Sequence, residues 1–331
     1  MNVVPRSISM AVKALSLLAI AVCAAHVQAQ GPGYPAKPVV LVVPFPPGGA
    51  VDIIGRLVGK KLGDRLGQAV VIENRAGAGT IVGAGYVAKS APDGYTLFIS
   101  SGSTFTVNPA INANLPYDPV KSFEPIGLVA RVPLILLANR DVPADNLKQM
   151  MAAVKAAPGK YAYGSFGNGT TGHFAGEMVL GATGMKLQHI PYKGSAPAIA
   201  DLIGGQIPFS VDTVAASLPH IKSGKIKGIA VTGARRATLL PEVPTVAESG
   251  FPGFDADSWV AIAAPRGLPP EVKSRLEKAL AQTMKDQDIQ EKLVANGLEP
   301  SYATPEQVVA MIDKDLPRMR AIAQKASIQA N

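Results

Sequence analysis

Small residues with hydrogen-bond donors are concentrated at four junctions where an apolar, strand-like run leads into a helical pattern. The first turn of a helix has N–H groups without partners and a partial positive charge. Glycine lets the backbone approach a ligand closely, and serine or threonine hydroxyls add further donors. These features are typical of a site for a small anion. The four junctions are PFPPGGAVD (44–52), RAGAGTIVGAG (75–85), ISSGSTFTVNP (99–109) and YGSFGNGTTGHFAGEM (163–178).

Nucleotide, metal and nucleophile motifs do not fit the sequence. The first junction lacks the lysine of the GxxxxGK[ST] motif, and GAGTIVGAG (77–85) does not have the spacing of a dinucleotide-binding loop. The histidines at 173, 189 and 220 show no metal-binding spacing such as HExxH, and the sequence has no GxSxG motif. We therefore expect no cofactor, no metal site and no catalytic residue.

Two side-chain roles remain open at this stage. Ser165 and His173 share one junction, eight residues apart. A periplasmic serine hydrolase would need these two side chains in contact, together with a carboxylate that orients the histidine. Asp212 ends the run PFSVD (208–212) and either receives a donor group of a ligand or caps the helix that follows.

The first 29 residues have the pattern of a secretory signal peptide. They contain Arg6 and Lys13, an apolar segment from Ala14 to Ala25, and small residues at a cleavage site that ends with Ala29. Cys23, the only cysteine, lies inside this leader. A lipid anchor at Cys23 is the alternative, although Val22 before it is larger than the residues that such sites favour. We expect an exported, soluble protein in the periplasm of a Gram-negative bacterium, without disulfides.

The charge of the chain is positive but dispersed. Its formal net charge is +8, and Arg6 and Lys13 of the leader account for two of these charges, which leaves +6. The densest basic spot is Arg235-Arg236, and there is no basic stripe with interleaved aromatic residues. Nucleic-acid binding is therefore disfavoured, and a mild preference for anionic ligands is expected.

Strand-like and helical patterns alternate along most of the chain, which predicts α/β units around mainly parallel sheets. The segment after about residue 268 is predicted to be helical without strands. Amphipathic helices are expected at 50–66, 145–157, 171–183 and 195–203. Strands are expected at 38–45, 69–74, 95–100, 134–139, 160–166, 187–192, 208–213, 226–233 and 258–265.

The predicted strands form two groups, which indicates two lobes. The run at 258–265 follows the second group and precedes only predicted helices, so the chain is expected to return there to the first lobe. Two crossovers between the lobes would form a hinge with a cleft. The expected domains are a signal peptide (1–29), a first lobe (30–131 and 258–331) and a second lobe (132–257).

Several long segments resemble the Bug family, the periplasmic solute-binding proteins of tripartite tricarboxylate transporters. The resemblance runs from about residue 34 to the C-terminus. It implies a two-lobe α/β periplasmic binding protein, a type II-like Venus flytrap with two interlobe crossovers and a helical C-terminal segment. The segments are PFPPGGAVDIIGRLV (44–58), VIENRAGAGTIVGAGYVAKSAPDGYTLF (71–98), YDPVKSFEPIGLVA (117–130), YGSFGNGTTGHFAGEM (163–178), PYKGSAPAIADLIGGQI (191–207) and LPEVPTVAESGFPGF (240–254).

The same resemblance implies where a ligand would be held. The first-lobe loop comprises Phe45, Pro46, Pro47, Gly48 and Gly49, helped by Ser100 and Ser101. Tyr192 and Asp212 lie where other members of the family select among ligands. The second-lobe loop comprises Ser165, Asn168, Gly169, Thr170, Thr171 and His173.

The implied function is capture of a small organic carboxylate between the lobes and its delivery to the membrane permease of a tripartite tricarboxylate transporter. Dicarboxylates, tricarboxylates and aromatic carboxylates all remain possible ligands. The stretch PFSVDTVAAS (208–217) differs from the frequent Phe-Asp-Asn type of the family, which makes an amino-acid ligand less secure. The alternative is a carboxylate-sensing receptor for a signalling partner. We expect a monomer that catalyses no reaction.

Overall fold

The computed structural model describes residues 33–325 and residue 328. The chain divides into two compact units, Met1–Ala36 and Lys37–Asn331, and the second unit contains all the described strands and helices. The predicted signal peptide, with Cys23, lies outside the described residues. Among the helices that the structure describes, none is both long enough and apolar enough to cross a membrane.

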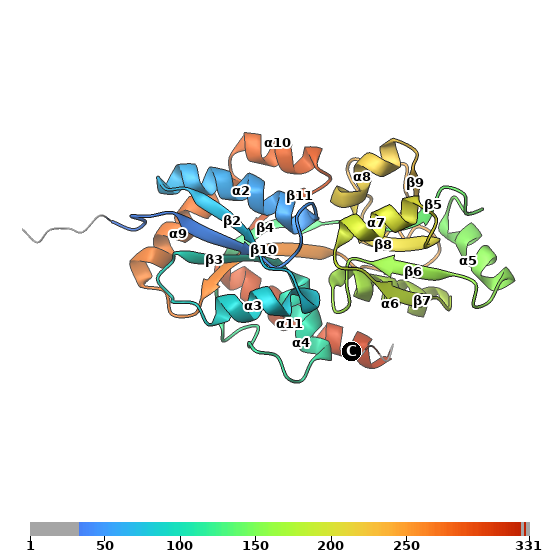
Figure 1. The fold of residues 1–331 in the computed structure, drawn as a ribbon, viewed down its shortest axis with the longest axis horizontal. Helices are drawn as coiled ribbons and strands as arrows, with labels where there is room; N and C mark the ends of the chain where they lie inside the picture. Colours follow the sequence, from blue (N-terminus) through green and yellow to red (C-terminus); the bar gives the residue numbers. More distant parts are fainter. Residues whose placement is uncertain (1–32, 326–327, 329–331) are drawn as a thin grey trace, which may run out of the picture. The chain divides into compact units, whose positions relative to one another are not determined.

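The first sheet has six strands in the order β11-β4-β10-β3-β1-β2 (Figure 1). The strands β2, β1 and β3 are parallel, whereas β10 runs antiparallel to both β3 and β4, and β11 runs antiparallel to β4. The bounds are β1 Val39–Val43, β2 Val70–Asn74, β3 Thr96–Ser101, β4 Phe123–Val132, β10 Ser258–Pro265 and β11 Glu299–Ala303.

The second sheet has five strands in the order β7-β6-β8-β5-β9. The strands β7, β6 and β8 are parallel, and β5 runs antiparallel to its neighbours β8 and β9. The bounds are β5 Leu134–Asn139, β6 Ala162–Ser165, β7 Gln188–Pro191, β8 Phe209–Thr213 and β9 Ile226–Val231. We call each sheet with its helices a lobe, the first and the second.

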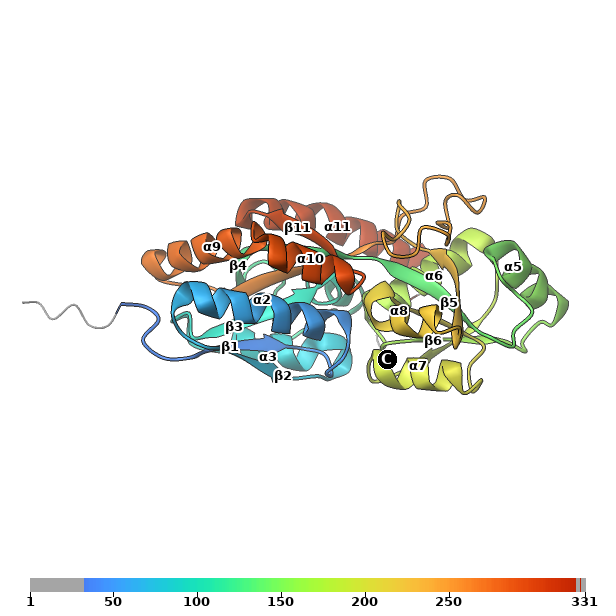
Figure 2. The same ribbon diagram turned by 90° about the horizontal axis from the view of Figure 1, so that it is seen from above.

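The chain passes between the sheets twice. It leaves the first sheet at Val132 and enters the second at Leu134, and it returns between Val231 and Ser258. The second view shows the two lobes side by side, joined by these crossing segments (Figure 2). The two-lobe α/β fold expected from the sequence is confirmed.

Several details of the sequence prediction were wrong, and they include the strand β4, which was not predicted. The sheets are mixed and not mainly parallel, because β10 and β5, the strands that follow the crossovers, run against their neighbours. The C-terminal segment also contains a strand, β11, which the helical pattern around it concealed. Pro300 lies in β11 at the edge of the sheet, where a missing N–H is tolerated.

Helices cover both faces of each sheet. In Figure 1, α2 and α10 lie on one side of the first sheet, and α3, α4 and α11 lie on the other. The helices of the first lobe are α2 Ala50–Leu66, α3 Ile81–Ala88, α4 Asn108–Ile111, α9 Pro270–Met284, α10 Gln287–Ala295 and α11 Pro305–Lys325, with short helical turns at Ala78–Thr80 and Ser103–Val107. The helices of the second lobe are α5 Leu147–Ala156, α6 Thr171–Thr183, α7 Ser195–Ile203 and α8 Val214–Lys222.

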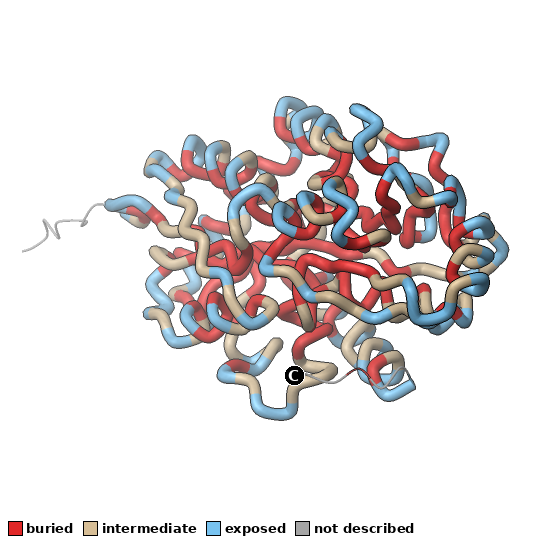
Figure 3. The backbone as a smooth tube through the Cα atoms, turned by 45° about the vertical axis from the view of Figure 1, so that its right-hand side comes forward, coloured by how far each residue is buried: buried red, intermediate tan, exposed pale blue. Residues whose placement is uncertain are grey.

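The central strands of each sheet form the buried centre of each lobe (Figure 3). In the first lobe, Trp259 of β10 stacks on Phe105 with ring centroids 5.7 Å apart, and its Nε1–H donates to Asp315 at 3.2 Å. Phe98 and Phe123 stack beside this pair. Such aromatic packing fixes the return strand β10 rigidly in the first lobe, next to the crossover.

Candidate functional site

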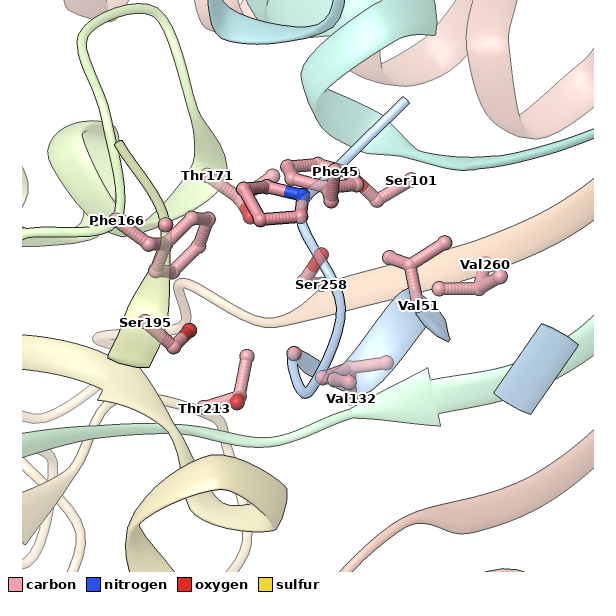
Figure 4. A pocket seen from close by; sticks show the side chains of 14 residues that line it. Phe45, Val51, Ser101, Val132, Phe166, Thr171, Ser195, Thr213, Ser258 and Val260 are labelled. Atoms are coloured by element: carbon pink, nitrogen blue, oxygen red, sulfur yellow. The ribbon is translucent and has the colours of Figure 1, made fainter. Parts of the chain in front are cut away.

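A small cavity of about 30 Å³, which we call the inner cavity, lies between the two lobes (Figure 4). None of its lining residues, all within the described part of the chain, has a charged side chain. Its polar lining consists of hydroxyl groups and the backbone of two helix starts. The lining residues are Phe45, Pro46, Gly49, Ala50, Val51, Ser101, Val132, Phe166, Thr171, Gly194, Ser195, Thr213, Ser258 and Val260.

The first helix start is that of α2. Its N-cap is Gly49, which provides no side-chain cap, and Gly49, Ala50 and Val51 all line the inner cavity. The hydrogen bonds among the described residues leave the N–H groups of these three residues unpaired. The positive end of α2 therefore faces the cavity with free donors.

Gly48, in contrast, is not free to donate. Its N–H donates to Asp52 Oδ2 at 3.0 Å, and Asp52 also accepts from Arg56 and Asn74. Burial opposes ionisation of Asp52, but the hydrogen bonds from Arg56, Gly48 and Asn74 hold the pKa of this carboxyl below its usual value. The ionised Asp52 therefore shapes the loop before α2, and Gly48 serves this loop rather than the cavity.

The second helix start is that of α7 in the other lobe. Its N-cap is Gly194, which also provides no side-chain cap, and both Gly194 and Ser195 line the cavity. The two helix starts approach closely. A Cβ on Gly194, which has a φ of +115°, would lie 3.0 Å from Pro46, and one on Gly49 would lie 3.8 Å from Ser195 Oγ. The glycine at 194 thus permits the close approach of the lobes, whereas a Cβ at Gly49 would make only an ordinary contact.

Asp212 lies behind the lining and not in it. Its carboxylate is fully buried, and its Oδ1 accepts from Ser195 Oγ at 2.7 Å and from Thr213 N at 2.7 Å. Its Oδ2 has no hydrogen-bond partner among the described residues. Burial raises the pKa of Asp212 to about 6, although the hydrogen bonds from Ser195 and Thr213 oppose this rise.

Ser165 and His173 are close to the second-lobe loop but do not contact each other as the hydrolase alternative requires. Ser165 Oγ lies 2.7 Å from His189 Nε2, and the Ser165 side chain is completely buried. His173 stacks on His189 with ring centroids 4.0 Å apart, and its Nδ1 accepts from Gly169 N at 3.4 Å. These side chains support the loop from beneath.

Burial shifts the acidity of both histidines. It lowers the pKa of His173 to about 4. It also lowers the pKa of His189, to about 3, with a smaller contribution from the neighbouring His173. Both rings are therefore neutral at physiological pH, and a neutral His173 Nδ1 can accept the Gly169 N–H.

The lobes are in direct contact around the cavity. Thr171 N donates to Ser103 Oγ of the first lobe at 3.0 Å, and Phe45 and Phe166 meet edge to face with centroids 6.4 Å apart. Gly79 of the first lobe packs so closely on Asn168 that a Cβ would overlap the Asn168 carbonyl. The structure is thus a closed form.

A second, wider opening, which we call the outer cavity, continues past Phe45 and Phe166, since both residues line the two spaces. Its first-lobe wall is the segment 76–81 with Asn108, Ile111 and Asn112. Tyr192 belongs to its second-lobe wall and donates its hydroxyl hydrogen to Asp201 at 2.7 Å. Burial and the Asp201 carboxylate raise the pKa of Tyr192 to about 12.

The residues predicted from the sequence fall into three sets. Phe45, Pro46, Gly49, Ser101 and Thr171 line the inner cavity. The outer cavity is lined by Asn168, Gly169, Thr170 and Tyr192, and again by Phe45 and Pro46. Neither cavity is lined by Pro47, Gly48, Ser100, Ser165, His173 or Asp212.

Sequence reasoning missed several lining residues. Ser195 follows a glycine at the start of an amphipathic helix, as Ala50 does, and this signal could have identified it. Val132 and Ser258 are cross-strand partners in β4 and β10, so only the sheet brings them together. The other missed residues are Ala50, Val51, Phe166, Gly194, Thr213 and Val260.

Comparisons with known proteins agree with this architecture. Residues 54–328 match the family described as the tripartite tricarboxylate transporter family receptor, TctC. The chain is 38% identical to the protein BugT of Bordetella pertussis over 293 residues, which cover 88% of this chain and 90% of BugT.

Solved structures of similar proteins contain carboxylates. One is R. palustris Rpa4515 with adipate, with a TM-score of 0.87, 34% identity, and coverage of 89% of this chain and 99% of that one. Another is MatC from Rhodopseudomonas palustris with bound malate, with a TM-score of 0.82, 28% identity, and coverage of 87% and 99%. The chain therefore belongs to the TctC family of tripartite tricarboxylate transporter receptors, and it is a Bug-type periplasmic solute-binding protein.

Proposed function

We propose that this protein captures a small organic carboxylate in the inner cavity and delivers it to the membrane permease of a tripartite tricarboxylate transporter. The observation that carries the proposal is the meeting of two uncapped helix starts, those of α2 and α7, from opposite lobes. Both helices direct the positive ends of their dipoles at one small space, which favours an anion.

Neutral donors are sufficient for such a ligand. The α2 start offers the free N–H groups of Gly49, Ala50 and Val51. Ser101 and Thr171 add hydroxyls from the two lobes. A hydrogen bond to a charged acceptor contributes about 1.5–3 kcal/mol net, so four to six of them, less the ordering costs, reach roughly the −8 kcal/mol of a micromolar site.

Closure of the lobes couples binding to a change of shape. The contacts of Thr171 with Ser103 and of Phe45 with Phe166 exist only when the lobes are together. A ligand held by both lobes adds interactions that an open form cannot make, and it therefore shifts the population toward the closed form. The closed receptor is the form that presents its ligand to a permease.

The relatives support a carboxylate as the ligand. Rpa4515 was solved with adipate and MatC with malate, and both share the fold and most of the length of this chain. The absence of charged side chains among the described lining residues fits a reversible receptor, which must release its ligand for transport. Export to the periplasm by the predicted signal peptide would place the receptor beside its permease.

The test is binding by the purified protein to a panel of aliphatic and aromatic carboxylates, measured by thermal shift and then by calorimetry. A true ligand at 100 times its Kd adds about 2.7 kcal/mol of stability. Thr171→Val removes one cavity hydroxyl and should weaken binding about tenfold. Thr183→Val, at the far end of the same helix α6, is the matched control and should leave Kd unchanged. A panel that produces no thermal shift would contradict the proposed function.

A further inference from the structure

Five hydroxyl groups line the inner cavity, and they differ in what they can offer a ligand. Those of Ser101, Thr171 and Ser258 donate to no acceptor among the described residues, so their hydrogens are available. Ser101 Oγ accepts only the N–H of Ser103, at 3.3 Å. These three groups can therefore act as donors to a carboxylate.

The hydrogens of the other two hydroxyls, those of Ser195 and Thr213, are already engaged in hydrogen bonds with Asp212. Ser195 Oγ donates to Asp212 Oδ1 at 2.7 Å, and Thr213 Oγ1 lies 3.4 Å from the same oxygen. Thr213 Oγ1 also accepts the N–H of Ala216 at 3.2 Å. A hydroxyl has a single hydrogen, so Ser195 can present only lone pairs to the cavity while Asp212 holds that hydrogen.

The two acceptor hydroxyls lie apart from two of the three free donors, and the third donor, Ser258, lies between the two groups (Figure 4). In Figure 4, Ser195 and Thr213 are at one end of the cavity, and Ser101 and Thr171 are at the other, beside Phe45. The acceptor end also contains the uncapped start of α7, whose backbone N–H groups are donors. An end group that fits this place must both accept from a backbone N–H and donate to Ser195 Oγ.

The partner-free Oδ2 of Asp212 is consistent with a role beyond structure. Thr213 already caps α8 through its own side chain, so the carboxylate is not needed for that cap. Burying a charged group with one oxygen unpaired costs stability. This cost is offset by the fixed orientation of the Ser195 and Thr213 hydroxyls, whose hydrogens Asp212 Oδ1 accepts.

We propose that Asp212 is a positioning residue that turns the hydroxyl of Ser195 into an acceptor, so that the site selects a small monocarboxylate with an uncharged donor group at its far end. A primary amide or a hydroxyl fits this description. A second ionised carboxylate does not, because it has acceptors only and would face the lone pairs of Ser195. The inference rests on the proposed function and adds the class of ligand.

The experiment compares matched probes by calorimetry at pH 8, where all carboxylates are ionised. The pairs are succinate with its monoamide succinamate, and adipate with its monoamide adipamate. In the unaltered protein, a monoamide should bind at least about tenfold more tightly than the dicarboxylate of equal length. A dicarboxylate that binds as tightly as its monoamide would overturn the inference.

Variants distinguish the positioning of the Ser195 hydroxyl by Asp212 from a general effect of the substitutions on the fold. Asp212→Ala releases both hydroxyl hydrogens, so the preference should fall to about one or reverse. Ser195→Ala removes the acceptor and should abolish the preference as well. Asp212→Asn keeps the oxygen that Thr213 N–H holds, and it should retain the preference within about threefold. Asp145→Asn, a surface carboxylate of the second lobe that pairs with Lys227, is the control.

The outcomes distinguish this inference from the proposed function. If Asp212→Asn lost the preference for the monoamide, the preference would come from the charge of Asp212. The proposed positioning of the Ser195 hydroxyl would then be wrong. An unchanged preference in both Asp212→Ala and Ser195→Ala would also overturn the inference, while carboxylate binding itself would stand. If Asp212→Ala fails to fold, Ser195→Ala still decides the question. Binding of no carboxylate by the unaltered protein would contradict the proposed function.

Discussion

At the scale of single residues, the second-lobe loop depends on two neutral histidines. His173 accepts the N–H of Gly169, and His189 stacks on His173 and contacts Ser165 Oγ. Tyr163 packs on His189 and donates to Glu177 at 2.6 Å, which completes a buried polar cluster behind the loop. Because burial lowers the pKa of both histidines, folding excludes protons that the unfolded chain would bind.

Acid should therefore destabilise the protein through this pair. Below the ordinary histidine pKa of about 6.5, the unfolded state binds more protons than the native state, so stability falls as pH falls toward the native values of about 4 and 3. His189→Gln should remove about 1 kcal/mol of the loss between pH 7 and pH 5.5. Urea unfolding at several pH values measures this effect.

The matched control is His220→Gln, in the last turn of α8 and outside the stacked pair. It should keep the acid response of the unaltered protein. If His189→Gln loses as much stability between pH 7 and pH 5.5 as the unaltered protein does, the buried pair is not a source of the acid sensitivity.

At the scale of elements, the start of α6 affects both the stability of the fold and the wall of the inner cavity. Thr170 is its N-cap: the hydroxyl accepts from His173 N at 3.4 Å and donates to Gly167 O at 2.6 Å. The Thr170 side chain thus holds the loop at Gly167 and caps the first turn of α6. The next residue, Thr171, lines the inner cavity and bonds to the first lobe. The position of the cavity wall therefore depends on a helix cap.

Replacement of this cap should affect both properties. Thr170→Ala should lower the free energy of unfolding by about 1 kcal/mol, the usual value of such a cap, and should weaken ligand binding several-fold. Asn146→Ala removes the N-cap of α5, whose side chain accepts from Gln149 N. This control should cost similar stability without a change in Kd. Equal binding by the two variants would contradict the link between the α6 cap and the cavity.

At the scale of the whole molecule, binding requires that the lobes come together without steric conflict. Gly79 has a φ of +60° and packs against the backbone of Asn168, and Gly169 packs against Asn108. These contacts lie at the outer cavity and not at the inner one. Small residues on both sides of the interface permit a closeness that any Cβ would prevent.

Gly79→Ala should therefore impede closure without altering the inner cavity. The new methyl group would overlap the Asn168 carbonyl, and the backbone conformation is unfavourable for alanine. We expect Kd to rise about tenfold or more, and small-angle X-ray scattering with ligand to show a larger radius of gyration. Gly181→Ala on α6 has open space and should leave both properties unchanged. Unchanged affinity in Gly79→Ala would mean that this contact does not limit closure.

The sequence alone predicted most elements of this molecule. The helices at 50–66, 171–183 and 195–203 and the strands at 134–139 and 258–265 have the predicted bounds. These segments have a clear hydrophobic period, which is a local property. The strands β4 and β11 were missed because Pro125, Gly127 and Pro300 weaken the local signal, and pairing within the sheet stabilises them nevertheless.

The site divides in the same way. Sequence alone determined that glycine and hydroxyl residues follow strands and begin helices, because these are local features of the chain, and from them it predicted an anion site. Only the tertiary structure decided which of these residues share one cavity, that Asp212 lies behind Ser195, and that Ser165 contacts His189. The shared cavity depends on two crossovers and on β10 pairing with β4, contacts between residues more than a hundred positions apart. The contacts of Asp212 and Ser165 depend on the pairing of β6 with β7 and β8 in the second sheet. No local pattern encodes either kind of contact.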